Sequence, residues 1–204
     1  MSQTAEVLEA LQGQRIYIPA LLAALCGLRR GEISALRWRN VDLEASYLKI
    51  MEGVEQMNNG GIRIKETKSG RARTVALPSS VRDALRVHKL KQAQDLLRHG
   101  IRVTDESFVT CLADGSMMRP KYLTHEWLRA VRRADLPRIC FHGLRHTHAT
   151  LLLASGVHPK IASERLGHSN IAITLDLYSH VMPGMQEDAV AKVDAAFRTA
   201  TKKK

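Results

Sequence analysis

The sequence predicts an α+β protein that is mainly α-helical and carries one small three-stranded antiparallel β-sheet. In most of the chain, apolar residues recur three or four positions apart, and the segments with this spacing end at glycines. One stretch, 47–77, instead alternates apolar and polar residues, as half-buried strands do. At 204 residues, the chain is long enough to bury a sizeable core within one domain.

The first part of the chain is expected to form two helices and then a short third one. The first two are predicted at 3–12 and 15–27, because Gly13 separates two runs of helical spacing and Gly27 ends the second. The longest apolar run, IYIPALLAALCGL, is too short to cross a membrane, so we expect a core helix there. A short helix then begins at GEISALRW.

The predicted sheet is a meander of three antiparallel strands. Its strands are YLKIME, GIRIKET and ARTVALP, and its turns are MNNGG and the tip from Lys68 to Arg71. After the meander nearly every segment is predicted to be helical, apart from the short extended piece SFVTCL. The later helices are predicted at 79–100, 121–136, 141–156, 158–167, 170–181 and 184–200. Their expected apolar stripes include Leu123, Trp127, Leu128 and Val131 in one helix and Val190, Val193 and Phe197 in the last.

A strong positive charge favours a polyanionic partner. Lys and Arg number 31 against 20 Asp and Glu, which gives a net charge of +11. Ribosomal, histone-like and membrane-surface proteins share such a charge, so it does not identify the partner by itself. The N-terminus lacks the basic-then-apolar pattern of a signal peptide. Cys26, Cys111 and Cys140 show no CxxC spacing, so we expect reduced, buried thiols in a cytosolic protein.

Two helical segments each place an arginine three residues from a possible partner. GLRRGEISAL puts Arg29 and Glu32 on one face, where the carboxylate can hold the arginine fork towards a phosphate. FHGLRHTHAT does the same for His142 and Arg145. A solvated surface ion pair is the plainer interpretation of the first pair. A zinc site at His142 and His146 is disfavoured, because a glycine stands where the metalloprotease pattern has glutamate.

Two further segments supply a tyrosine, a histidine and a basic turn. LGHSNIAITLDLYSHV exposes His168 in a turn and carries Tyr178 on the next helix, although a half-buried core tyrosine is the plainer interpretation. KETKSGRARTVALP places Lys68 at a hairpin tip, which can enter a DNA groove and bring an ammonium group near a phosphate. The residues expected to add phosphate contacts are Arg37, Arg39, Arg63, Lys65, Arg71 and Arg73.

Together these segments resemble the tyrosine recombinases, also called the phage integrase family, from about Ala5 to Phe197. The family pattern Gly-Leu-Arg-any-Gly-Glu matches 27–32, His-any-Leu-Arg-His-Thr matches 142–147, and Leu-Gly-His matches 166–168. The spacing from His168 to Tyr178 is similar to that of integrases from temperate phages and conjugative transposons. The resemblance implies the tyrosine recombinase catalytic-domain fold, with the catalytic set Arg29, Lys68, His142, Arg145, His168 and Tyr178.

The implied reaction is DNA strand cleavage and rejoining through a 3′-phosphotyrosyl intermediate, with no metal and no ATP. By this resemblance, Tyr178 is the nucleophile, and Arg29, Arg145 and His168 bind the non-bridging oxygens of the phosphate. Lys68 is the general acid for the leaving oxygen, and His142 helps to deprotonate the tyrosine. Glu32 orients the cationic side chains. The resemblance also implies that 1–204 is one catalytic domain without the N-terminal core-binding and arm-binding domains of whole family members.

The expected partners are double-stranded DNA, a homotetramer of the full-length protein on paired sites, and accessory DNA-bending proteins, but no membrane. In that tetramer the residues after Met182 would pack on a neighbouring subunit. The expected location is the nucleoid of a bacterial or phage-infected cell. Two other functions stay open: a type IB topoisomerase, which relaxes supercoils as a monomer, and a non-catalytic DNA-binding protein.

Overall fold

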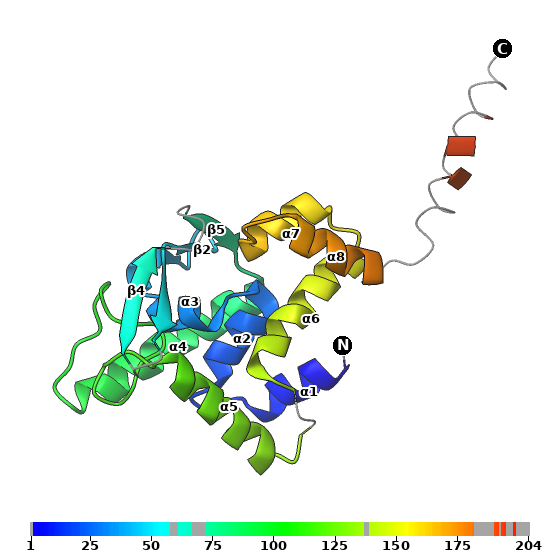
Figure 1. Cartoon of the computed structure of the whole chain (residues 1–204). Coiled ribbons are helices and arrows are strands. Elements are labelled where there is room, and N and C mark those ends of the chain that lie inside the picture. Colours follow the sequence, from blue (N-terminus) through cyan, green and yellow to red (C-terminus); the bar gives the residue numbers. More distant parts are fainter. Residues whose placement is uncertain are drawn as a thin grey trace.

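The computed structural model describes residues 2–57, 61–66, 72–136 and 139–181, together with 190, 191, 193, 194 and 198. Within them the chain is mainly helical, with small antiparallel sheets beside the helices (Figure 1), so the predicted class is confirmed. The helices are α1 (Ser2–Ala10), α2 (Tyr17–Cys26), α3 (Arg30–Ala35), the 3-10 helix η1 (Trp38–Asn40), α4 (Ser79–Leu97), α5 (Pro120–Arg133), α6 (Phe141–Ala154), α7 (Pro159–Leu166) and α8 (Ala172–Val181). The strands are β1 (Val41–Asp42), β2 (Tyr47–Ile50), β3 (Glu52–Gln56), β4 (Ile62–Glu66) and β5 (Arg73–Ala76).

The helix α2 lies at the centre of the core. Eight of its ten residues are buried, because its sequence is apolar on nearly every side. It packs against α1, α3, α4 and α6, so helices from both halves of the chain close around it (Figure 1). The expectation of a core helix is therefore confirmed. No helix among the described residues is long and apolar enough to cross a membrane.

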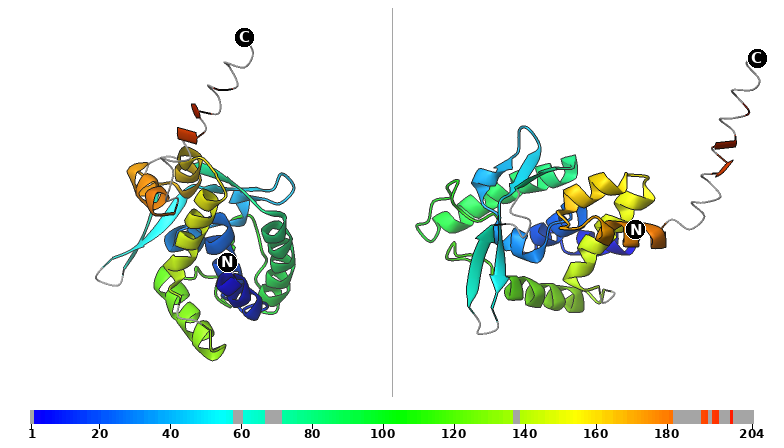
Figure 2. Two further views of the ribbon diagram at one scale, coloured as in Figure 1. Left: turned by 90° about the vertical axis from the view of Figure 1, so that its right-hand side faces the viewer. Right: turned by 45° about the horizontal axis from the view of Figure 1, so that its top comes forward.

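The strands pair differently from the predicted meander. β2 pairs with β1 on one side and β5 on the other, while β3 and β4 form a separate ribbon that projects from the helices (Figure 2). The predicted first strand is divided at Met51, and its second part continues into β3. The meander is wrong because alternation identifies a strand but not its partner. Most of the predicted turn at MNNGG lies outside the described residues, but at its two ends the Met57 N–H donates to the Gly61 carbonyl at 2.8 Å.

Some side-chain expectations are also wrong. Leu128 is 53% exposed, because the buried stripe of α5 passes through its neighbour Trp127 and leaves the next position outside. Val190 and Val193 are exposed in the single chain and Phe197 lies outside the described residues, so the packing expected for them on a neighbouring subunit stays a prediction. Of the three cysteines, only Cys26 is buried.

A buried histidine of α6 joins α6 to α2 and α7. His148 Nδ1 lies 3.1 Å from the Ala24 carbonyl of α2, and Arg165 Nε–H of α7 donates to His148 Nε2 at 3.2 Å. Because a carbonyl only accepts, the ring proton belongs on Nδ1 and the imidazole is neutral. Burial, and then the charge of Arg165, lowers the pKa of His148 to about 4.

This histidine should make the protein less stable in acid. The folded pKa of about 4 lies below the ordinary 6.5, so the unfolded chain binds a proton that the folded chain does not. The contribution is complete above pH 6.5 and is lost as the pH falls towards 4; it amounts to about 3 kcal/mol at most. Urea unfolding between pH 7.5 and 4 should therefore show a shallower loss for His148→Gln than for the wild type. His125→Gln, at an exposed position of α5, is the control and should keep the wild-type slope.

Candidate active site

A buried glutamate joins two arginines at the start of α3. Glu32 is 5% exposed, and its Oε1 accepts hydrogen bonds from Arg29 and from Arg73, both at 2.9 Å. Its Oε2 accepts from the Arg29 backbone N–H at 2.8 Å and from Arg73 at 2.7 Å. Burial works to raise the pKa of the Glu32 carboxyl, but the bonds and charges of Arg73 and Arg29 outweigh it and hold the pKa below its usual value. Glu32 is therefore ionised and has the geometry that its predicted orienting role requires.

A third arginine reaches the same place from α6. Arg145 is 5% exposed and donates to the carbonyls of Gly27 at 2.5 Å and Leu166 at 2.7 Å. Arg29 also donates to a carbonyl, that of Gly167, at 2.6 Å. Burial, and then the charge of Arg29, lowers the pKa of Arg145 to about 9, so it stays protonated at neutral pH. Main-chain carbonyls at the ends of α2 and α7 thus hold both predicted clamp arginines.

These carbonyls are presented by two glycine turns. α2 ends at Gly27 and α7 ends at Gly167, with left-handed φ angles of 69° and 65°. Other residues adopt this conformation only with strain. At Gly167 a Cβ would also come within 2.7 Å of the Arg73 guanidinium. The glycines of both matched motifs are therefore needed for the position of the arginines.

The arginine cluster, defined as Arg29, Arg73, Arg145 and their carboxylate partner Glu32, carries an excess of positive charge. Arg29 and Arg73 bind the Glu32 carboxylate, while Arg145 binds main-chain carbonyls, so three guanidiniums stand beside one carboxylate and leave a surplus of two positive charges. The Arg29 side chain is 35% exposed, so the cluster is open to solvent at that side chain. A partly desolvated cationic site of this kind binds an anion more strongly than the same groups would in water.

His168 and Tyr178 lie on the elements that adjoin the cluster. His168 follows Gly167 directly, and its Nδ1 is 2.8 Å from the Thr174 hydroxyl of α8. Burial, and then the charges of Arg145 and Arg29, lowers the pKa of His168 to about 4, so the ring is neutral. Tyr178 is one helical turn after Thr174 and shares its face of α8. Tyr178 is half-buried, and its hydroxyl forms no hydrogen bond to the residues that the structure describes.

His142 stands on the outer side of α6. It is exposed, and its ring lies 4.7 Å from that of His146, centroid to centroid, in a perpendicular arrangement. Burial, and then the charges of His146 and Arg145, lowers the pKa of His142, so the neutral ring can accept a proton at pH 7. Within the described ranges no third metal-ligating side chain joins the two histidines, which gives the zinc alternative no further support.

The segment between β4 and β5 that was predicted to form a basic turn lies outside the described residues from 67 to 71. Lys68 and Arg71 lie outside the described residues, so their predicted roles stay predictions. Arg73 is on β5, and its side chain is 11% exposed, which does not favour the phosphate contact predicted for it. The sequence contains a signal for this inward position. Arg73 is two and four residues before the buried Val75 and Leu77, so all three side chains point to the same face of the strand. Sequence reasoning also missed the buried His148 and its partner on α7.

The other residues predicted to touch DNA are distributed over two surfaces. Arg37 and Arg39 both pair with Glu106, and Arg39 is the nearer at 2.6 Å. Arg63 and Lys65 are exposed on the β3–β4 ribbon, where Lys65 pairs with Glu55. Exposed ion pairs of this kind contribute little stability and can exchange for phosphate contacts. Contact with DNA stays a prediction for all four.

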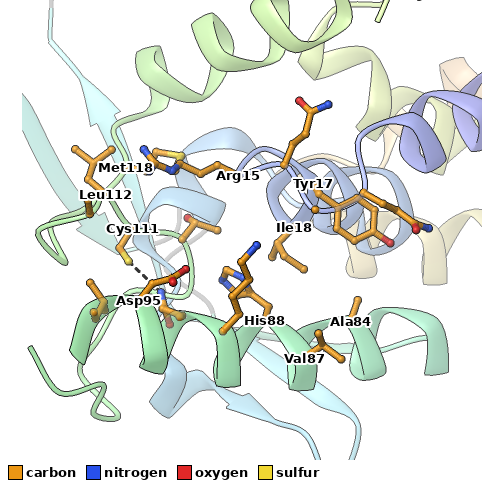
Figure 3. A pocket seen from close by; sticks show the side chains of 18 of the residues that line it. Arg15, Tyr17, Ile18, Ala84, Val87, His88, Asp95, Cys111, Leu112 and Met118 are labelled. Carbon is orange, nitrogen blue, oxygen red and sulfur yellow. Dashed lines mark hydrogen bonds between the residues drawn. The ribbon is translucent and has the colours of Figure 1, made fainter. Parts of the chain in front are cut away.

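A large pocket lies elsewhere in the molecule. It has a volume of about 840 Å³ and lies between the segment 12–18, the helix α4 and the segment 110–113 (Figure 3). Its walls include Tyr17, Ile18 and Val87, and a hydrogen bond from Gln92 to Cys111 crosses one side. Its lining contains none of the described members of the predicted catalytic set, so the chemistry is not placed there.

Comparison with known proteins gives a consistent result. The model of a family described as the phage integrase family matches residues 2–184. A tyrosine recombinase XerC-like protein of Caldanaerobacter subterraneus is 34% identical over 94% of the chain and 52% of its own length. The ICEBs1 integrase of Bacillus subtilis is 26% identical over 85% of the chain and 47% of its own length. The chain therefore spans about half the length of the curated relatives it matches.

Solved structures share the fold. The Tn1549 transposon integrase in complex with a circular intermediate DNA has a TM-score of 0.79 at 22% identity, covering 94% of this chain and 64% of that one. XerA recombinase has a TM-score of 0.69 at 21% identity, covering 94% of this chain and 63% of that one. The arrangement of helices and small sheets is thus that of recombinase catalytic domains, as the sequence predicted.

Removing the charge of Glu32 should destabilise the whole site. Glu32→Gln would leave Arg29 and Arg73 partly buried without their shared carboxylate, and breaking a buried ion pair costs about 3 kcal/mol. Urea unfolding at pH 7 measures the loss. Glu106→Gln is the matched control, because that carboxylate is 63% exposed and pairs with two arginines at the surface. Equal stability of the two variants would contradict the central role given to Glu32.

Proposed function

Because this chain belongs to the phage integrase family, we propose that it supplies the catalytic centre of a site-specific DNA recombinase. Its substrate is double-stranded DNA, and Tyr178 forms a covalent bond to the 3′ side of the cut strand. The arginine cluster is the observation that carries this function. Two of its arginines and a neutral histidine lie on elements next to the helix of a tyrosine, and this arrangement of charge supports binding of a phosphodiester there.

The reaction begins with attack on the scissile phosphorus by the Tyr178 oxygen. The bond from phosphorus to the 5′-oxygen breaks, which gives a 3′-phosphotyrosyl link and a free 5′-hydroxyl. His142, neutral at pH 7, accepts the tyrosine proton, and Lys68 gives a proton to the leaving oxygen. The link keeps the energy of the ester, so a second 5′-hydroxyl can reverse the step and rejoin a strand without ATP.

The cluster supplies charge where the reaction develops it. Arg29 and Arg145 bind the non-bridging oxygens, which carry more negative charge in the transition state than in the DNA. Both guanidiniums are fixed in advance by Glu32 and by main-chain carbonyls, so little reorganisation is needed. His168 donates a further hydrogen bond from Nε2 when the Thr174 hydroxyl donates to its Nδ1. Side chains supply every positive charge in this mechanism.

The wider assembly follows the same proposal. Residues 1–204 act as a catalytic domain within a homotetramer that assembles on paired sites in bacterial or phage DNA. The residues after Met182 pack on a neighbouring subunit of this tetramer. Accessory proteins that bend DNA assist the assembly.

A type IB topoisomerase is the competing enzyme. It would relax a supercoiled plasmid that carries no recombination site, whereas a recombinase would leave that plasmid supercoiled.

Covalent trapping tests the nucleophile. Nicked duplexes with a randomised core are incubated with the chain, and with any longer product of its gene, in the presence of a chelator. The sequences selected in denaturation-stable adducts define the site. Tyr178→Phe should bind such a duplex with unchanged affinity and form no adduct, because the ring remains while the attacking oxygen is lost. An adduct formed by this variant would remove Tyr178 from its role, and no wild-type adduct at all would leave a DNA-binding protein.

Replacing one clamp tests the electrostatic part. Arg145→Lys keeps the positive charge but replaces the planar guanidinium by a single ammonium group. That group cannot donate to the Gly27 carbonyl, the Leu166 carbonyl and a phosphate at the same time. We expect the single-turnover cleavage rate to fall by about 100-fold, with the dissociation constant for DNA changed by about threefold or less. Arg129→Lys, at an exposed ion pair on α5, should cleave at the wild-type rate. A clamp variant that cleaves as fast as this control contradicts the assignment.

A further inference from the structure

We propose that Arg165 is a positioning residue, which fixes the end of α7 so that three carbonyls there hold the arginine cluster. This inference rests on the proposed function, because it says how the groups that bind the phosphate oxygens are kept in place. Arg165 lies in the last turn of α7, directly before the Leu-Gly-His motif. It belongs neither to the predicted catalytic set nor to the residues predicted to touch DNA.

The end of α7 holds each arginine of the cluster by one main-chain carbonyl. The carbonyls of Arg165, Leu166 and Gly167 accept, in that order, from Arg73 at 2.9 Å, Arg145 at 2.7 Å and Arg29 at 2.6 Å. The left-handed turn at Gly167 directs its N–H groups to the earlier carbonyls of Ser163 and Glu164, which leaves these three carbonyls to the arginines. The position of three consecutive peptide groups thus sets the position of all three guanidiniums.

A helix as short as α7 depends on tertiary contacts for its orientation. It has eight residues, and an isolated helix of that length is not stable in water. The Arg165 side chain supplies contacts to three neighbouring elements. Nη2 donates to the Ala76 carbonyl of β5 at 3.0 Å and to the Leu25 carbonyl of α2 at 3.4 Å. Nε donates to His148 Nε2 of α6 at 3.2 Å, so the last turn of α7 is fixed from three sides.

His148 gives the contact with α6 its direction. Its Nδ1–H is bonded to the Ala24 carbonyl, so the neutral ring presents a lone pair on Nε2 to Arg165. The same ring lies against the turn at the end of α2, because a Cβ at Gly27 would come within 2.6 Å of His148 Cδ2. The Gly27 carbonyl in that turn is the second acceptor of Arg145. One buried imidazole therefore adjoins both of the turns that hold this clamp.

The competing role for Arg165 is direct contact with a DNA phosphate. The side chain is half-buried, but Nε and Nη2 are bonded to acceptors of the protein itself. Arg165→Lys would keep the attraction to a phosphate and lose the planar fork that reaches α6 and β5 together. A phosphate contact would therefore largely survive in this variant, whereas the positioning role would not.

Arg165→Lys should slow cleavage without weakening the binding of DNA. Its single-turnover rate on a selected nicked duplex is expected to fall about tenfold, with the DNA dissociation constant within about threefold, because displaced clamps act mainly on charge that develops in the transition state. Arg98→Lys is the matched control, since Arg98 is 75% exposed and pairs with a neighbouring aspartate, and it should match the wild type. A wild-type rate in Arg165→Lys overturns the inference, while the wild-type adduct still supports the recombinase function.

A methylphosphonate duplex tests whether the loss arises at the clamp. A methyl group in place of one non-bridging oxygen of the scissile phosphate removes its negative charge, so less of the rate depends on the guanidiniums. The defect of Arg145→Lys, in the clamp itself, should shrink on this substrate, and the defect of Arg165→Lys should shrink by the same factor within about threefold. An Arg165→Lys defect that is equal on both duplexes, beside a relieved Arg145→Lys, would show that Arg165 acts elsewhere. An unrelieved Arg145→Lys would contradict the clamp, and the inference with it.

A second readout does not depend on activity. A hydrogen bond from a guanidinium moves the carbon-13 resonance of a carbonyl downfield, so the Leu166 and Gly167 carbonyl carbons report the bonds to Arg145 and Arg29. Both resonances should move upfield in Arg165→Lys and stay in place in Arg98→Lys. Unchanged resonances in Arg165→Lys would overturn the inference. A wild type that forms no adduct on any duplex would instead refute the proposed function, whatever the resonances of the variants show.

Discussion

The structure depends on one ionised carboxylate that is almost completely removed from water. Taking a carboxylate out of water costs several kcal/mol unless charged donors replace the lost hydration. Glu32 has such donors only because Arg29 directly precedes α3 and because β5 brings Arg73 to the same carboxylate. The helix start, the strand pairing and the end of α7 must therefore form together, which makes the site a cooperative part of the fold rather than an addition to its surface.

The same cluster sets the protonation of its surroundings. Burial, together with the neighbouring guanidiniums, lowers the pKa values of Arg145 and His168 to about 9 and about 4. The site thus resists a further positive charge and keeps its histidines neutral, so their rings can donate and accept hydrogen bonds at pH 7. A bound anion relieves the repulsion between the guanidiniums, because its negative charge offsets the positive charge that Glu32 alone does not neutralise. The positive charge of the arginines thus favours a bound phosphate and, together with burial, keeps the histidines neutral.

Local patterns in the sequence predicted the parts of the site that lie close together along the chain. The spacing of Arg29 and Glu32 predicted their pairing, and the glycines after α2 and α7 predicted turns at the places where the carbonyls are presented. Spacing did not predict depth. His142 and Arg145 are three residues apart on α6, yet the first is exposed and the second is buried, because helical spacing gives direction around the axis but not how closely other elements pack.

The contacts that sequence reasoning missed are those between residues distant in the chain. Arg73 is 41 positions from Glu32, and Arg165 is 89 positions from Ala76. The chemistry of strand transfer requires particular side chains beside particular atoms of the DNA, so these side chains form recognisable sequence motifs. Many different combinations of other side chains can hold the catalytic side chains in place. Only the tertiary packing shows which combination this chain uses. A phosphate contact was predicted for Arg73, but its alternation with the buried Val75 also favours an inward-pointing side chain, and an arginine largely removed from water requires a carboxylate or carbonyl partner. An inward-facing charge in an otherwise ordinary strand is thus the feature by which a supporting residue can be found before the fold is known.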